Sequence, residues 1–430
     1  MKDPNLHSTI KTLALGYLDY LRKLVEARGG TIPTRTVVEV LVEKAMFPVR
    51  DYQEPDYASL VSSSVREFVK SPELQAAVRA VLSNPDVTAL LERKTYAQVD
   101  HSLTFEILQP LAVRLLEAQH GLEFSDKDFD LVFAQLEDCL ESKVDKYLLL
   151  TPLSTFSMDM EEAVVGPFTL RKLAPSEIAA FNDIDASAMS FVRVMPQGPA
   201  TCAIELTQSV GWDGKESPLT ALNSDRFWWF VACLKLVKSG PVHYSSIWVR
   251  PSGWTGMTFR QGPLVPKTTA ILGKYELAAS DLPELQRYWK FVETFAGREQ
   301  PFWHVAMFRF TDAIDRVRDD EALIDLWIAC ESLFGDETEQ GELTYRLSLR
   351  LAHFVSSDPR EREQIREAAR DAYKGRSSLL HGARKLDAVK MRERRRKMED
   401  LMRAALRKCV LEPSISHDQM LEKIEASIVG

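Results

Sequence analysis

Apolar residues in the first third of the chain recur every three or four positions, which is the spacing of one buried helix face. Ser125 and Asp126 indicate a further helix start, because serine and aspartate are common there. No catalytic grouping of side chains is evident there. We therefore predict a helical N-terminal region over residues 1–148. The helix-type spacing is found at Leu13, Leu18, Leu21 and Leu24, and within residues 61–69, 74–82 and 111–118.

The pattern changes near residue 148, where short β-type runs separated by proline and glycine begin. We predict a small α+β middle domain over residues 149–278. Its aromatic residues, Trp228 and Trp229 among them, are expected in a core, and the alternative is a platform for stacking a ligand. Strands are predicted at residues 168–170, 191–194, 202–206 and 243–249, and helices from residue 175 and over residues 226–237.

From Asp281 onward the spacing of apolar residues is again that of helices, and the loops between them are short. Short loops favour antiparallel neighbours, so residues 279–430 are expected to form an all-helical bundle. The whole chain is then a multi-domain α+β protein that is mostly α. The bundle's helices are predicted at residues 282–295, 302–317, 321–334 and 343–355, then from residue 359, and finally over residues 386–410.

Composition places the chain among ordinary globular proteins, with 45% apolar and 27% charged residues. No apolar run approaches the roughly 18 to 20 residues that span a bilayer. The first residues lack the apolar core of a signal peptide, so a cytoplasmic protein without membrane contact is expected. The five cysteines are scattered, without metal-site or redox spacing, and are expected to be buried and free.

Charge is distributed unevenly along the chain. Residues 359–408 hold 17 Lys and Arg against 8 Asp and Glu, a net charge of +9, although the whole chain carries −8. A basic segment on an acidic chain suggests an anionic partner, while the alternative is a solvated, salt-bridged helix pair. Residues 390–397 could follow RNA phosphates along an exposed helix face. The candidate RNA-binding residues are Lys374, Lys390, Arg394, Arg395 and Lys397.

Within this basic segment, Arg376 and His381 stand five residues apart, which is about 140° of rotation on a helix. They converge if Gly375, Ser377 or Ser378 distorts the turn. An arginine can bind a phosphate and a histidine can transfer protons, which suffices when the nucleophile is the 2′-hydroxyl of RNA. No cluster with metal-ligand spacing lies near this pair, so no metal or cofactor is expected.

Glu331 lies at the edge of an apolar helix face, where a carboxylate is costly unless it is paired. Two interpretations are open. The carboxylate either orients Arg376 or His381, or it pairs with Arg346 or Arg350 on the following helix.

Four stretches of the C-terminal region carry a family resemblance: residues 308–316, 322–334 and 343–352, and the RSxxxHG motif at residues 376–382. In this order, they resemble the ApeA-like HEPN domains. The family implies a helical bundle, usually dimeric, in which an arginine and a histidine four to six residues apart form a metal-independent RNase centre, often in bacterial antiviral defence. It also implies a supporting role for the polar Ser377. Cys330 before Glu331 and Gly375 before Arg376 depart from the family pattern without removing a catalytic group.

We therefore predict an endoribonuclease with Arg376 and His381 as catalytic residues, serving antiviral defence by abortive infection. The N-terminal and middle regions would sense a viral trigger or a regulatory protein. Because one chain offers a single plausible histidine, we expect a homodimer, with Leu379 and Leu380 either in its contact or in the core. The alternatives are a non-catalytic HEPN module that binds RNA or scaffolds a partner, and a nucleotide-binding middle domain, which lacks a recognisable phosphate loop.

Overall fold

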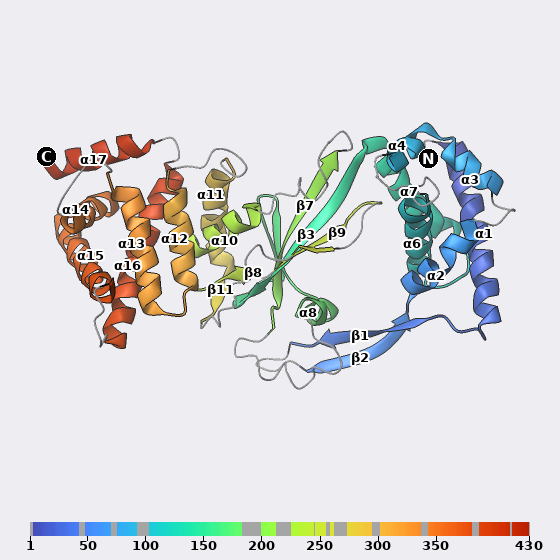
Figure 1. Ribbon diagram of the computed structural model, residues 1–430, viewed down its shortest axis with the longest axis horizontal. Helices are drawn as coiled ribbons and strands as arrows, with labels where there is room; N and C mark the ends of the chain where they lie inside the picture. The colour runs from blue at the N-terminus through green and yellow to red at the C-terminus, as the bar shows by residue number, and fades with distance from the viewer. Residues whose placement is uncertain are drawn as a thin grey trace.

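The elements of the computed structural model follow one another along a single long axis (Figure 1). The N-terminal helices lie at one end, a β-sheet lies in the middle, and the C-terminal helices form a bundle at the other end. The described part of the chain is mostly helical with α+β content, as predicted. The residues described are 3–42, 48–69, 75–92, 103–182, 199–211, 225–244, 246–254, 259–261, 273–294, 302–336, 343–380, 387–412 and 415–429.

Helices make up most of the N-terminal region, and their buried faces follow the predicted spacing. Leu13, Leu18 and Leu21 are all buried on the first helix. Asp3 caps that helix, because its carboxylate accepts hydrogen bonds from two backbone N–H groups of the first turn. The elements are α1 (Pro4–Ala27), α2 (Tyr57–Val69), α3 (Gln75–Leu82), α4 (Pro85–Glu92), a π-helix η1 (Thr104–Leu108), α6 (Gln109–Gln119) and α7 (Asp126–Ser142).

A hairpin interrupts these helices, and residues 144–148 belong to a strand of the central sheet. The prediction of a helical region over residues 1–148 is therefore wrong for these two segments. Strand β1 (Thr34–Val40) pairs in antiparallel fashion with β2 (Val49–Pro55). Its strands are rich in charged and polar residues, and an ion pair between Arg50 and Glu39 joins them on the exposed side. Because few of its residues are apolar, hydrophobic spacing alone does not reveal it.

The sheet in the middle of the molecule is built around strand β3 (Val144–Ser154). The strand order is β10-β9-β3-β7-β6-β5, with antiparallel neighbours throughout. The other elements are β5 (Glu162–Val165), β6 (Phe168–Lys172), α8 (Pro175–Phe181), β7 (Cys202–Gly211), α10 (Asp225–Val237), β8 (His243–Tyr244), β9 (Ile247–Pro251) and β10 (Phe259–Gln261). Successive side chains of β3 face opposite sides, so Leu149 packs with α10, while Leu150 packs with α8 and β1.

The strands predicted at residues 168–170, 202–206 and 243–249 are confirmed, with longer or divided bounds, and so are the helices α8 and α10. The strand predicted at residues 191–194 lies outside the described residues. Trp229 and Phe230 of α10 are buried, as expected of core aromatics, whereas Trp228 is half-buried. Two further short strands, β4 (Phe156–Met158) and β11 (Tyr275–Leu277), form a separate parallel pair.

Among its described residues, the C-terminal bundle contains the six predicted helices and one more. A short 3-10 turn (Ala279–Asp281) precedes them. Gly335 ends the third helix, as predicted, and Asp387 caps the sixth. The helices are α11 (Leu282–Val292), α12 (His304–Asp315), α13 (Asp319–Phe334), α14 (Leu343–Val355), α15 (Pro359–Leu380), α16 (Ala388–Leu411) and the unpredicted α17 (His417–Val429).

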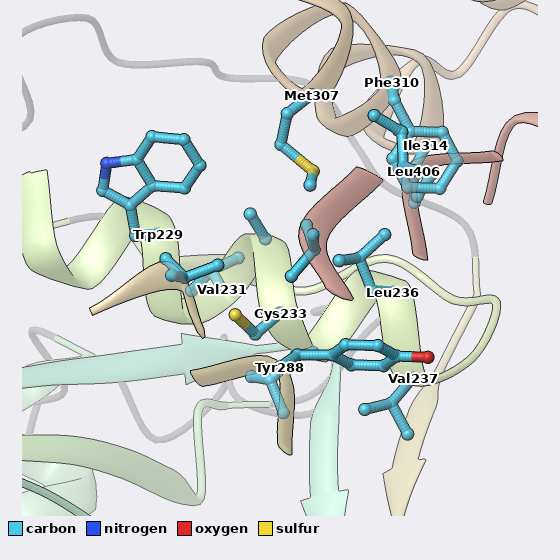
Figure 2. Packing of buried hydrophobic residues seen from close by; sticks show 14 of the residues in the cluster. Trp229, Val231, Cys233, Leu236, Val237, Tyr288, Met307, Phe310, Ile314 and Leu406 are labelled. Atoms are coloured by element: carbon cyan, nitrogen blue, oxygen red, sulfur yellow. The ribbon is translucent and has the colours of Figure 1, made fainter. Parts of the chain in front are cut away.

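One hydrophobic core continues from the sheet into this bundle, and α10 lies at its centre. Figure 2 shows Cys233 and Leu236 of α10 among side chains of three bundle helices, such as Tyr288, Met307 and Leu406. All five cysteines of the chain are free and buried, as expected. The division into regions 1–148, 149–278 and 279–430 stays a prediction, and its second boundary falls within this continuous core.

Charged side chains are buried in the same joint between the sheet and the bundle. Lys235 of α10 is only 2% exposed, and its Nζ donates to Asp315 of α12 at 2.6 Å. His243 of β8 lies 3.5 Å from the other oxygen of the same carboxylate. An isolated buried charge is unfavourable, so this pairing ties α10 and the sheet to α12.

Trp254 is one of the side chains that join the sheet to the N-terminal helices. Trp254, just after β9, is 1% exposed and packs in the N-terminal core. Its indole N–H donates to the carbonyl of Glu106 at 2.8 Å, and the guanidinium of Arg114 lies over its ring. The N-terminal region is therefore held to the sheet by this side chain as well as by the chain connection from α7 to β3.

Candidate functional site

The sequence places the catalytic pair at the end of α15. This helix continues without interruption through Gly375, Arg376 and Ser377 to Leu380. The backbone of α15 is therefore regular at Gly375, Ser377 and Ser378, where a distortion was expected to bring Arg376 and His381 together. His381 lies outside the described residues, and the side chains of residues 376–380 are not described. The structure thus fixes the backbone of Arg376 and Ser377 in the last turns of α15.

Gly375 marks a close approach of three helices next to Arg376. Gly375 is buried, and a β-carbon at this position would lie 3.0 Å from Cδ2 of Leu323 and 3.2 Å from Cδ of Arg394. Glycine inside a helix costs about 1 kcal/mol relative to alanine. A side chain at residue 375 would therefore require small shifts of the Leu323 and Arg394 side chains.

Helices α13 and α15 run antiparallel, which defines the end of the bundle where the motif lies. Leu323 near the start of α13 lies beside Gly375 near the end of α15. At the other end, the ring of Phe334 contacts that of Phe354, five residues before α15 begins. Between these points, Trp327 packs edge-on against Tyr373, with ring centroids 5.2 Å apart. The end of α15 therefore meets the starts of α13 and α16.

Glu331, the predicted supporting carboxylate, is half-buried two turns beyond Leu323 on α13. Helical side chains lean toward the N-terminus of their own helix, so a side chain at this position leans toward the motif end. Of the two alternative partners, Arg350 donates to Glu425 at 2.6 Å and to the carbonyl of Phe334 at 2.9 Å. Support of the site by Glu331, or pairing of Glu331 with Arg346 or Arg350, stays a prediction.

Arg394 of α16 is joined to α15 by a bidentate ion pair. Its Nε and Nη2 donate to the two carboxylate oxygens of Asp371, at 2.9 and 2.8 Å. These hydrogen bonds lower the pKa of Asp371 and raise that of Arg394, because each charge stabilises the other. The guanidinium of Arg394, which was predicted to bind RNA, therefore binds a carboxylate of the same chain.

Arg395 holds the end of α12 rather than facing solvent. Its side chain is 16% exposed and donates to the carbonyls of Ala313, Ile314 and Arg316 at 3.0 to 3.1 Å. It also pairs with Asp319 at 3.0 Å. The expectation that residues 390–397 form one exposed basic face is thus corrected at Arg395. Carbonyls at a helix end lack partners within the helix, and this cation satisfies them.

The other predicted RNA-binding residues are exposed near the motif end. Lys374 lies two residues before Arg376, and Lys390 lies in the first turn of α16. Lys397 is 58% exposed and pairs with Glu393 at 2.8 Å. Arg396 beside it is also exposed, although the sequence interpretation did not single it out. These cations lie where α15 ends and α16 begins.

Two groups with clear roles were missed by the sequence interpretation. No sequence motif marks Asp371. Its spacing of four residues from Gly375 shows only that both lie on one face of the helix. Lys235 did carry a signal, since it is the one charged residue within the apolar run from residue 227 to 237. A lysine in such a position requires a buried partner, here Asp315.

In comparisons with models of known protein families, with curated proteins and with solved structures, no match to the chain was found. The resemblance to ApeA-like HEPN domains therefore rests on the residues quoted above. Nowhere among the described residues do three or more His, Cys, Asp or Glu side chains gather as metal ligands would. Of the described helices, none combines the length and the apolar character needed to cross a membrane.

Proposed function

We propose that the protein is a metal-independent endoribonuclease of HEPN type, with Arg376 and His381 as its catalytic residues. The observation that carries the proposal is the position of Arg376 in the last turns of α15, at the end of the bundle where the exposed cations of α16 begin. Lys390 and Lys397 supply positive charge beside the motif, as a polyanionic substrate requires.

The reaction is transesterification within the RNA. The 2′-hydroxyl oxygen attacks the adjacent phosphorus, the bond from phosphorus to the 5′-oxygen breaks, and a 2′,3′-cyclic phosphate and a 5′-hydroxyl are formed. His381 exchanges the protons, taking one from the 2′-hydroxyl or giving one to the departing 5′-oxygen. The guanidinium of Arg376 stabilises the charge that develops on the phosphate oxygens. The nucleophile belongs to the substrate, so no metal-bound water is needed.

The test is cleavage of a labelled single-stranded RNA by the purified full chain. Arg376→Ala and His381→Ala should each abolish cleavage while leaving the circular dichroism spectrum unchanged. Arg360→Ala is the matched control, because Arg360 is exposed in the first turn of the same helix, at the other end of the bundle. Cleavage should persist in EDTA and yield cyclic phosphate ends. If the wild type does not cleave RNA, and both variants bind RNA as tightly as it does, the protein is better described as a non-catalytic RNA-binding module.

The proposal extends to two chains sharing one site. Transesterification uses an acid and a base on opposite sides of the phosphate, and one motif supplies one histidine. In a two-fold dimer with α15 near the axis, both motifs reach the same phosphate. Mixing wild type with excess His381→Ala should lower activity more than dilution does, because mixed dimers are inactive. Activity that falls only in proportion to dilution contradicts a shared site.

A role in antiviral defence by abortive infection, with residues 1–278 sensing a viral trigger or a regulatory protein, belongs to the same proposal. Its support is the resemblance of the C-terminal region to ApeA-like HEPN domains. Expression of the wild type should reduce phage yield and slow growth of infected cells, and His381→Ala should remove both effects. Protection that persists in His381→Ala would separate defence from RNA cleavage.

A further inference from the structure

The ion pair between Arg394 and Asp371 joins α16 to α15 one to two turns before the motif. Both hydrogen bonds are short, at 2.8 and 2.9 Å, and they use the Nε and Nη2 atoms of the guanidinium. Asp371 is on α15, five residues before Arg376, and Arg394 is on α16. Two parallel hydrogen bonds fix orientation as well as distance. This pair, called the clasp below, therefore sets how α15 and α16 lie against each other at this end.

Gly375 is enclosed by the same arginine. Gly375 follows Asp371 by four residues and so lies on the same face of α15. Cδ of Arg394 would be 3.2 Å, and its Nη1 3.5 Å, from a β-carbon at residue 375. On the other side, Leu323 of α13 would be 3.0 Å away. The alkyl part of Arg394 thus covers the residue next to Arg376, while its charged end binds Asp371.

The surrounding charges favour this arrangement. The clasped carboxylate also lies in the field of Lys374 and Lys397, and Arg394 lies in that of Asp387 and Glu393. Asp371 side-chain atoms are 55% exposed, whereas those of Arg394 are 22% exposed. The arginine is therefore the more enclosed partner, with two of its three nitrogen atoms donating to Asp371.

We propose that Arg394 and Asp371 are positioning residues, which hold the last turns of α15 so that Arg376 stands in register for catalysis. This rests on the proposed function, and it replaces the expectation that Arg394 contacts RNA. The two roles predict opposite effects of one substitution. Asp371→Asn releases the arginine: a positioning role predicts weaker catalysis, whereas an RNA-binding role predicts tighter RNA binding with catalysis unchanged or improved.

The experiment compares Asp371→Asn, Arg394→Lys and the reversed pair Asp371→Arg with Arg394→Asp in the full chain. We expect each single substitution to lower kcat by roughly ten- to a hundredfold, since small misplacements cost this much, with KM within about twofold of the wild type. The reversed pair should recover to within about threefold. Glu363→Gln is the control, because Glu363 pairs with Arg366 on the same helix, and among the described residues it pairs with no second helix. An unchanged kcat in Asp371→Asn, or tighter RNA binding, overturns the proposal.

Amide hydrogen exchange separates this proposal from the proposed function. If the clasp holds the end of α15, Asp371→Asn should speed exchange at residues 372–380 at least tenfold, leaving residues 359–367 unchanged. This measurement does not require the wild type to cleave RNA. Suppose that Asp371→Asn exchanges faster but the wild type does not cleave RNA. The proposed function is then refuted, and so is the catalytic part of this inference. The clasp remains as a structural contact. Unchanged exchange overturns the clasp itself. Gly375→Ala should reproduce the fast exchange if the variant folds.

Discussion

The two halves of α16 are both basic, yet their cations do different things. In the C-terminal half, Arg403 is buried and Arg407 is half-buried, and they donate to the carbonyls of the last turn of α10, at 3.0 and 2.7 Å. Lys408 donates to the last two carbonyls of α14. In the N-terminal half, Lys390, Arg396 and Lys397 are exposed, near the end of α15. One half holds helix ends, and the other presents charge to solvent.

Arg395 makes the comparison instructive, because it stands among the exposed cations but acts like the enclosed ones. It binds the carbonyls at the end of α12, as Arg403 and Arg407 do for α10. The ends of three helices are thus bound by cations of a single helix. Helix C-termini carry partial negative charge and unpaired carbonyls, so they attract such cations. Much of the net charge of +9 over residues 359–408 therefore serves the fold, and only the remainder is available to an anionic partner.

The largest effect is expected from Arg403→Met. Arg403 is 5% exposed and pairs with Glu399 at 2.6 Å, and Glu399 also accepts a hydrogen bond from Ser239. Removing the arginine leaves a buried carboxylate, which costs about 3 kcal/mol of unfolding free energy. Urea denaturation followed by circular dichroism measures this loss.

The double variant Arg403→Met with Glu399→Met is the critical control for this prediction. Removing both charges should restore part of the loss, because no uncompensated carboxylate remains. Arg396→Met in the exposed half should change stability by less than about 0.5 kcal/mol. Equal losses in Arg403→Met and Arg396→Met would remove the distinction between the two halves.

A smaller effect is expected from Arg395→Gln. The substitution leaves carbonyls at the end of α12 without their charged donor, and should destabilise the protein by about 1 to 2 kcal/mol. Affinity for RNA, measured below the unfolding temperature of the variant, should stay as in the wild type. If Arg395→Gln has normal stability and binds RNA more weakly, Arg395 binds RNA as the sequence predicted and does not stabilise the end of α12.

These cases show what the sequence can and cannot predict. The six helices of the bundle could be predicted because a buried face leaves a regular spacing, as residues 343–355 show. The partners of Arg395 and Arg403 could not, because the carbonyls they bind belong to α12 and α10, far away in sequence, and every residue has a carbonyl. Hairpin β1–β2 was missed for the complementary reason that polar strands leave no hydrophobic pattern. The motif at residues 376–382 could be recognised, but the clasp beside it depends on how α15 and α16 pack.

A modest effect on binding is expected from Lys397→Ala, if the exposed half of α16 contacts RNA as proposed. Each cation that neutralises a phosphate of a single strand contributes roughly 0.7 to the slope of log affinity against log salt. The variant should lower this slope by about that amount, as measured by fluorescence anisotropy with a single-stranded RNA. Lys423→Ala is the matched control, because Lys423 is exposed on α17, which crosses the other end of the bundle (Figure 1). Equal changes in both variants would mean that only net charge matters.

The smallest effect concerns pH and the ion pair between Asp371 and Arg394. Arg394 lowers the pKa of Asp371, and the nearby Lys374 and Lys397 act in the same direction. A carboxyl whose pKa is lower in the folded state contributes stability that is complete above its unfolded pKa, about 3.9, and is lost as the pH falls through its folded pKa. The difference in stability between the wild type and Asp371→Asn should therefore be constant from pH 8 to pH 5 and should shrink only below about pH 4. Urea denaturation of both proteins across this range measures it. A difference that already shrinks between pH 7 and pH 5 would mean that a histidine, and not the Asp371 carboxylate, controls this contact.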